Sequence, residues 1–354
     1  MILMGPCFSS RCQNPLRFLT TTSSLHMFRH RTVFVIGAGC SKNYKFDVGS
    51  ELLSNIVKKT AREDEVIASA LVRLPGGNID VRRRLKTFSA GLQSHETIDQ
   101  YLDFIKSDHL SVSLGKIAIA RCILEQEHAS GLTDEKLQIG VGSIAHTWVA
   151  RLISRILRDI GRENIADMFS NLTFVCFNYD RAIEQIAYHQ IRNATNDEGE
   201  TIAALSKLRV IHPYGSLGNI AWQRDLNTVH YGRGHDDYNT VLSASQSIRT
   251  FTETVESNLG KEINEAINNA EQVCFNGFGY IRQNMMLLKR DNEPAPRLTI
   301  MNQYLMPDPE RALAIRAVKA ALVRNSLLPG SMIETDLDAS DFMNHWLGTI
   351  FANS

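Results

Sequence analysis

The sequence has no C-x-x-C pair among its six cysteines. A structural zinc site needs four convergent thiolate or imidazole ligands, which closely spaced cysteines usually supply. We therefore expect no zinc. Cys40, Cys176 and Cys274 lie in or beside apolar runs that are typical of strands. This placement favours buried reduced thiols over a disulfide framework, and hence a cytoplasmic location.

Neither sign of charge is in excess, and there is no long apolar run. The 38 Lys and Arg residues balance the 38 Asp and Glu residues, which argues against broad, nonspecific nucleic-acid binding. No stretch approaches the ~20 apolar residues that a membrane helix needs. With 44% hydrophobic residues in 354, the chain can build a core large enough to hold a deep cleft.

Acidic residues are missing from the start of the chain. The first one is Asp47, and residues 1–30 contain three arginines and many Ser and Thr residues. A targeting peptide has such a composition, but this segment lacks a clean apolar core and has poor helical amphipathicity. We favour a disordered leader, or an upstream start codon with the natural start at Met27. Residues 31–354 are then expected to form a single domain.

Short apolar runs alternate with helical patterns along the rest of the chain. Continuous apolar runs that end at turns are typical of strands buried on both faces of a parallel sheet. The runs are Thr32–Ile36, Leu172–Phe177, Leu208–Ile211, Gln272–Asn276 and Arg297–Met301. Apolar residues recur at helical spacing in Val48–Lys58, Arg181–Gln190 and Glu310–Arg324. The alternation predicts an α/β fold with a Rossmann-like, doubly wound parallel sheet.

Two segments depart from this alternation. Residues 61–169 carry helical patterns, for example in Leu114–Leu124 and Ile144–Ile160, with no confident strand. They predict a large helical insertion between the first strand and the rest of the sheet. Residues 217–245 are polar and rich in Gly, Asn, Asp and His, which is typical of a long surface loop or lid.

Glycine-rich and polar motifs follow four of the predicted strands. Ligands of doubly wound sheets bind at the carboxyl ends of the strands, so the four segments are expected to converge on one cleft. The motifs are GAGCS at 37–41, FNYD at 177–180, HPYGS at 212–216, and NGFGY at 276–280 with Asn284 in the next turn.

The two glycine turns have a ligand-binding interpretation and a structural one. Gly37-Ala38-Gly39 would let the backbone approach a phosphate, with N–H donors from the following helix. Gly277, Gly279 and Asn284 would suit the ribose or adenine of a dinucleotide. The alternative for either turn is a tight connection between a strand and a helix with no ligand, and for the first turn we favour the nucleotide.

The polar residues also have two interpretations. Asn178 and Asp180 can orient a ribose hydroxyl or a water, or they can simply begin a helix. His212 titrates near neutral pH and suits a general base, although a lone histidine is more often structural. Asp99 and Asp103 lie on an amphipathic helix, where a solvated face is the favoured interpretation. Asp99 is retained as a candidate.

Taken in order, the four motifs resemble the sirtuin-like family over about residues 32–305. The segments VFVIGAGCSK, TIDQYLDF and HPYGSLG are most similar to bacterial stand-alone sirtuin-like proteins, many of which are NAD hydrolases in antiphage defence. This resemblance implies a single NAD-binding domain. It implies that NAD is bound as the substrate.

The resemblance also implies roles for individual residues. Asn178 and Asp180 would position the nicotinamide ribose and a water, and His212 would be the base. The diphosphate and its neighbouring ribose would be held by Gly37, Ala38, Gly39 and Ser41. The remaining NAD contacts would come from Gly215 and Ser216, and from Gly277, Gly279 and Asn284 around the adenosine half.

The sequence departs from deacylase sirtuins in two ways. It cannot build their four-cysteine zinc module, whose place in the chain is taken by the insertion at 61–169. Their proline–aspartate–phenylalanine–arginine segment is replaced by Lys42–Asp47. Both departures point away from acyl-lysine peptides and towards NAD consumption.

The resulting hypothesis is an NAD glycohydrolase that releases nicotinamide and ADP-ribose, acting as a regulated antiphage effector. A cyclic product is an open alternative. A homo-oligomer assembled through the insertion is expected, and a separately encoded activator, such as a DNA-translocating ATPase, is a family-level expectation. The alternatives are a regulatory subunit that binds NAD or ADP-ribose without turnover, and an NAD-dependent deacylase or ADP-ribosyltransferase.

Overall fold

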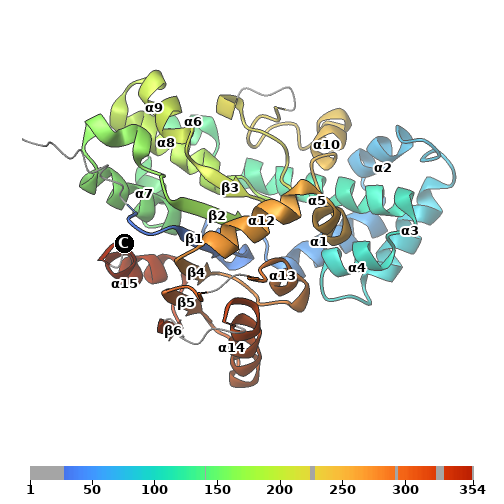
Figure 1. Ribbon diagram of the computed structural model, residues 1–354. Helices are drawn as coiled ribbons and strands as arrows, with labels where there is room; N and C mark the ends of the chain where they lie inside the picture. Colours follow the sequence, from blue (N-terminus) through green and yellow to red (C-terminus); the bar gives the residue numbers. More distant parts are fainter. Residues whose placement is uncertain (1–27, 140, 224–227, 292–293, 324–330, 353–354) are drawn as a thin grey trace, which may run out of the picture.

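The computed structural model describes residues 28–139, 141–223, 228–291, 294–323 and 331–352. Its centre is a six-stranded sheet in the order β3-β2-β1-β4-β5-β6, with every neighbouring pair parallel (Figure 1). This order is that of a Rossmann-like doubly wound sheet, so the predicted fold class is confirmed. The strands are β1 (Thr32–Ile36), β2 (Leu172–Cys176), β3 (Arg209–Ile211), β4 (Gln272–Asn276), β5 (Leu298–Asn302) and β6 (Ser331–Thr335).

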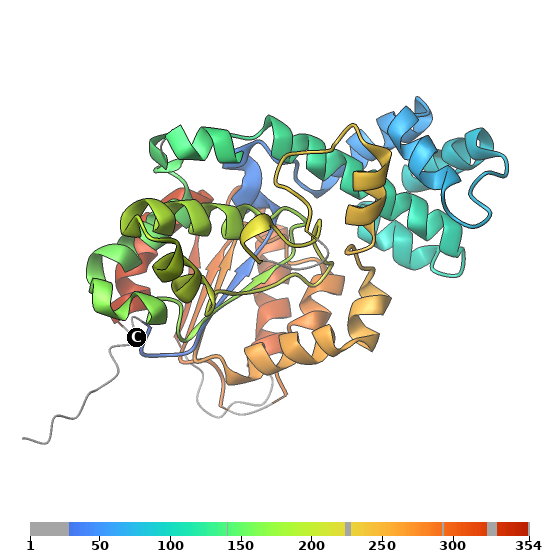
Figure 2. The ribbon, with the colours of Figure 1, turned by 90° about the horizontal axis from the view of Figure 1, so that it is seen from above.

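The central strands are buried because helices cover both faces of the sheet (Figure 2). All residues of β1, β4 and β5 are buried, as their continuous apolar runs predict. The sequence patterns predict five strands, of which Arg297–Met301 is the last, and they miss the edge strand β6. An edge strand has a neighbour on one side only, so β6 needs few apolar residues. Met332 and Ile333 are its only large apolar residues, which is too short a run to predict a strand.

Helices fill the long connection between β1 and β2. The 3₁₀ helix η1 (Ala38–Tyr44) follows β1 directly, and α1 (Gly49–Ala61) comes next. The described part of 61–169 contains helices and no strand, as predicted. These helices are α2 (Glu65–Val72), α3 (Val81–Leu92), α4 (Ile98–Phe104), α5 (His109–Ala129), α6 (Asp134–Ile139) and α7 (Trp148–Asp159), with the short 3₁₀ helices η2 (Val141–Ile144) and η3 (Arg162–Asp167).

The remaining helices connect the later strands and complete the layers. After β2 come α8 (Ala182–Thr195) and α9 (Glu198–Leu205), and after β3 come η4 (Ala221–Gln223), α10 (Tyr238–Ser245), α11 (Phe251–Glu256) and α12 (Asn258–Asn269). Then α13 (Arg282–Leu287), α14 (Asp308–Leu322) and α15 (Ala339–Ala352) follow β4, β5 and β6. Helices α2 to α4 lie to one side of the sheet (Figures 1 and 2).

Two sequence-based boundaries need correction. Residues 1–27 of the expected leader lie outside the described residues, but Phe28 is fully buried and its ring lies 4.9 Å from that of Phe351. The segment 217–245 is not one continuous loop, because its end forms α10, which packs against α5 and α2. Valine and alanine residues of α10 are buried there, a pattern that the polar composition of the segment masks.

The turns after β1 and β4 are in direct backbone contact. The Gly39 N–H donates to the Gly277 carbonyl oxygen at 3.0 Å. A Cβ on Gly37 would lie 2.4 Å from that same oxygen. Gly277 has φ +59°, and a Cβ there would lie 2.3 Å from the Cys40 nitrogen. The glycines are therefore required by the approach of two chain segments, whether or not a ligand binds.

We expect Gly277→Ala to destabilise the protein by about 2 kcal/mol or more, because it adds a clash to a left-handed backbone. Urea unfolding measures the change. The matched control is Gly348→Ala in α15, where an added Cβ meets nothing within 4 Å. This control should be neutral or stabilising by up to ~1 kcal/mol, since alanine is the better helix former. Equal effects of the two substitutions would contradict the proposed contact.

Candidate functional site

A cavity of about 450 Å³ lies at the carboxyl ends of β2, β1, β4 and β5. Its volume is in the usual range for a small-molecule site. The chain builds one half of the sheet from β1 outwards to β3 and the other half from β4 outwards to β6, so the switch between the halves lies between β1 and β4. Doubly wound folds bind their ligands at this switch. Four adjacent strands span three spacings, or about 14 Å. The cavity is therefore elongated across the sheet.

Most of the predicted site residues meet at this cavity. The first, second and fourth motifs all contribute to its wall, as the convergence of strand ends predicts. The predicted residues that line it are Gly37, Ala38, Gly39, Ser41, Asn178, Asp180, Gly277, Gly279 and Asn284. His212, Gly215 and Ser216 are not among the lining residues, although Tyr214 of the same motif is.

Asn178, Ser41 and Asp180 form one buried hydrogen-bond network. The Asn178 Nδ2 donates to Ser41 Oγ at 2.9 Å and to the Gly37 carbonyl at 3.1 Å. Ser41 Oγ in turn donates to Asp180 Oδ2 at 2.8 Å. The Asn178 Oδ1 is buried, and no hydrogen-bond donor reaches it among the described residues. A buried acceptor without a donor costs about 1–3 kcal/mol, so a ligand hydroxyl or N–H would be stabilised there.

Asp180 is held at the end of the network. Burial raises the pKa of its carboxyl to about 6, although the hydrogen bond from Ser41 opposes the shift. The second oxygen, Oδ1, accepts the Ala182 N–H at 3.1 Å. This contact with the start of α8 fits the helix-starting interpretation of Asp180, which also lines the cavity.

His212 lies behind Asn178 rather than in the cavity wall. Its Nδ1 lies 2.9 Å from the Asn178 carbonyl oxygen and its Nε2 lies 3.0 Å from Glu184 Oε1. Burial lowers the pKa of His212, but Glu184 and Cys176 raise it more, and the net pKa lies well above the usual value. With both ring nitrogens engaged, the imidazole holds the Asn178 backbone and is not placed to take a proton in the cavity.

Gly215 also has a structural explanation. It has φ +71°, and a Cβ there would lie 2.0 Å from the Ser247 carbonyl oxygen. A glycine is needed at this position because the chain segment before α11 passes too close for a side chain. The Tyr214 hydroxyl, by contrast, donates to Asn284 Oδ1 at 2.6 Å and joins the loop after β3 to α13 beside the cavity.

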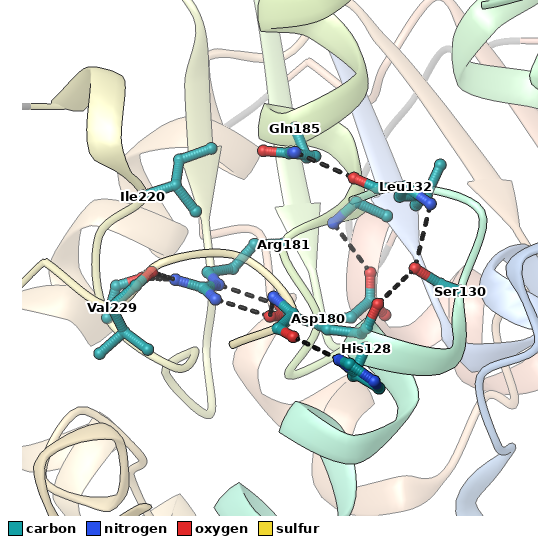
Figure 3. Close-up of polar contacts among 12 residues, drawn as sticks. His128, Ser130, Leu132, Asp180, Arg181, Gln185, Ile220 and Val229 are labelled. Atoms are coloured by element: carbon teal, nitrogen blue, oxygen red, sulfur yellow. Dashed lines mark hydrogen bonds and ion pairs between the residues drawn. The ribbon is translucent and has the colours of Figure 1, made fainter. Parts of the chain in front are cut away.

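A buried ion pair fixes the chain next to Asp180 (Figure 3). Arg181 donates to the two carboxylate oxygens of Glu127 at 3.0 and 2.6 Å, and the side chains are 1% and 0% exposed. Arg181 Nη1 donates to the Val229 carbonyl at 2.6 Å, and the Gly232 N–H donates to Glu127 Oε2 at 3.1 Å. The pair therefore ties α5 and the predicted lid to the strand end that carries Asp180.

Two cavity-lining carboxylates come from the first connection of the sheet. Asp47 Oδ2 accepts from Asn55 and Gln126 at 2.5 and 2.7 Å. Asp99, on α4, accepts a short hydrogen bond from the Tyr179 hydroxyl, so the solvated-face interpretation of Asp99 is wrong. Asp103, on the same helix, is half-buried and accepts from the Thr252 hydroxyl at 2.6 Å. The order of the motifs could not predict either contact, because each joins residues far apart in the sequence.

The far end of the cavity was also missed. Asn302 and Gln303 line it at the end of β5, and Glu310 of α14 also lines it. Asn302 directly follows a predicted strand, so the strand-end rule applied to the other motifs would have found it. Asp47, Asp99, Asp180 and Glu310 supply the charged groups of the lining, in which the described residues include no Lys, Arg or His.

Metal and membrane sites are absent from the described ranges. No group of three or more His, Cys, Asp or Glu side chains there could hold a metal ion. Likewise, no helix in those ranges is long and apolar enough to span a bilayer. The four described cysteines are all buried and free.

Comparison with protein-family models and with curated protein sequences gave no match. The geometry and charge of the cavity are therefore the basis for a functional proposal.

We expect Glu127→Ala to destabilise the protein by about 3–5 kcal/mol, because it leaves the Arg181 charge buried without a partner. Urea unfolding measures this change. The control is Glu200→Ala, which removes the exposed ion pair with Arg162 and should cost at most about 1 kcal/mol. A loss no greater than the control's would refute the anchoring role of Glu127.

Proposed function

We propose that this protein is an NAD glycohydrolase, which cleaves the bond between nicotinamide and ribose to give nicotinamide and ADP-ribose. The observation that carries the proposal is the unsatisfied Asn178 Oδ1, buried beside Ser41 and Asp180 in a cavity that crosses the switch between β1 and β4. A dinucleotide is the ligand class that doubly wound sheets bind at this place. The sirtuin-like motif order supports the same ligand.

The charge of the cavity suits the oxidised cofactor. Its nicotinamide ring is a cation, and the bond breaks through an oxocarbenium-like state in which positive charge moves onto the ribose. Carboxylates at fixed positions in a site shielded from water stabilise such a charge. The absence of Lys and Arg from the described lining removes the repulsion that would oppose it. The diphosphate would rely on backbone N–H groups, as in other dinucleotide-binding sheets.

Four residues have roles in this reaction. Asn178 Oδ1 would accept a hydrogen bond from a ribose hydroxyl and orient the sugar. Ser41 holds the Asn178 amide group in place, and Asp180 contributes negative charge to that end of the cavity. His212 would act as a positioning residue through the Asn178 carbonyl.

A second candidate is a regulatory subunit that binds NAD or ADP-ribose without turnover. The placement of His212 favours it, because the residue expected to be the base is turned towards Asn178 and Glu184. The two candidates share the binding site and differ in whether nicotinamide is released.

We expect purified protein to release nicotinamide from NAD, and Asn178→Ala to lower kcat/KM at least ~100-fold because the ribose loses its orienting acceptor. Chromatography of nicotinamide measures release, and calorimetry measures NAD binding. The control is Asn344→Ala, at an exposed position of α15. Wild-type activity in Asn178→Ala would contradict the site. Binding without release would favour the regulatory subunit.

A further inference from the structure

Asp99 reaches the cavity from the helical insertion rather than from a strand end. It lies in the first turn of α4, whose Thr97 and Ile98 also line the cavity. Its Oδ1 accepts a hydrogen bond from the hydroxyl of Tyr179, the residue between Asn178 and Asp180. The insertion thus places a carboxylate against the end of the cavity where the proposed chemistry occurs.

The position of Asp99 is held by contacts on both sides. Thr97 caps α4 by accepting the Gln100 N–H at 3.2 Å. One turn after Asp99, Asp103 accepts from the Thr252 hydroxyl of α11. The Tyr179 hydroxyl stays protonated, since burial and the neighbouring Asp99 raise its pKa well above the usual value. It is therefore a permanent donor that orients the Asp99 carboxylate.

The two titratable residues that the sequence motifs assigned to the reaction are already engaged. Both oxygens of Asp180 accept protein donors, from Ser41 and from Ala182. Both nitrogens of His212 are within hydrogen-bond distance of protein oxygens. Asp99 combines a place in the cavity wall with a side-chain donor on Oδ1, which leaves Oδ2 as the oxygen to meet a water.

We propose that Asp99 is a further catalytic residue of this cavity, the general base for the water that attacks the ribose. This inference rests on the proposed NAD glycohydrolase function. The bond between C1′ and the nicotinamide nitrogen breaks, and its electron pair neutralises the ring. The water oxygen bonds to C1′, and its proton passes to the Asp99 carboxylate and then to solvent. NAD⁺ and water thereby give ADP-ribose, nicotinamide and one proton.

The pH dependence follows from the groups around Asp99. Burial raises its pKa to about 6, and the Tyr179 hydrogen bond opposes this rise. Two other titratable groups lie near this part of the cavity. Burial, Asp99 and Asp103 raise the pKa of Tyr214, and Asp103 lies on the same helix as Asp99. A base must be ionised, so the rate should fall as pH drops through about 6. Removing the Tyr179 donor raises the Asp99 pKa, which moves this fall to higher pH.

The test measures nicotinamide release against pH for the wild type, Asp99→Asn, Tyr179→Phe and Glu265→Gln. We expect Asp99→Asn to lower kcat ~10²–10⁴-fold, the usual contribution of a general base, with NAD affinity by calorimetry changed less than about threefold. Tyr179→Phe should remain active with its acidic limb at higher pH. Glu265→Gln, which changes an exposed carboxylate of α12 outside the cavity lining, should match the wild type.

The outcomes distinguish a failure of the Asp99 assignment from a failure of the proposed NAD glycohydrolase function. A wild type that turns over NAD while Asp99→Asn keeps its rate and pH profile would overturn the role of Asp99 alone. A folded wild type without turnover would overturn the proposed function, and the catalytic role of Asp99 with it. A loss of NAD binding in Asp99→Asn that matches its loss of rate would make Asp99 a binding residue and overturn the base assignment.

Discussion

The buried ion pair between Arg181 and Glu127 is the constraint on which the geometry of the cavity depends. It joins the end of β2, the central helix α5 of the insertion and the chain after β3 through charges that water does not reach. A buried charge without its partner is costly, so these three segments keep one relative arrangement. Asp180 directly precedes Arg181, and its place in the cavity follows from that arrangement.

The helical insertion is part of the site. In sequence it interrupts the α/β alternation, which suggests an appended layer with a role in assembly. In the structure its helix α4 forms part of the cavity wall and supplies Asp99, while the turn before α1, ahead of the insertion, supplies Asp47. Together with Asp180 and Glu310, these residues are the charged groups among the described lining residues. That charge favours a cationic group in the ligand, which is a chemical constraint independent of the motif order.

The glycines carry less functional information than their motifs suggest. Gly37 lies against Gly277, and Gly215 lies against Ser247, at distances that exclude a Cβ. Each glycine is therefore required by chain packing. The polar residues beside them are more informative, because packing does not explain why the buried Asn178 Oδ1 lacks a donor. A glycine turn thus locates a strand end, and its polar neighbours indicate the chemistry.

The sequence by itself determined the parallel sheet, the helical insertion and the convergence of Gly37, Asn178 and Gly277. Apolar runs, helical spacing and strand-end motifs are local signals, and the rule that parallel strands end at one edge converts them into a site. Only the tertiary structure decided that His212 faces away from the cavity and that Asp99 faces into it. The residues that contact His212 and Asp99 come from segments far away in the chain, and local sequence patterns cannot predict such contacts.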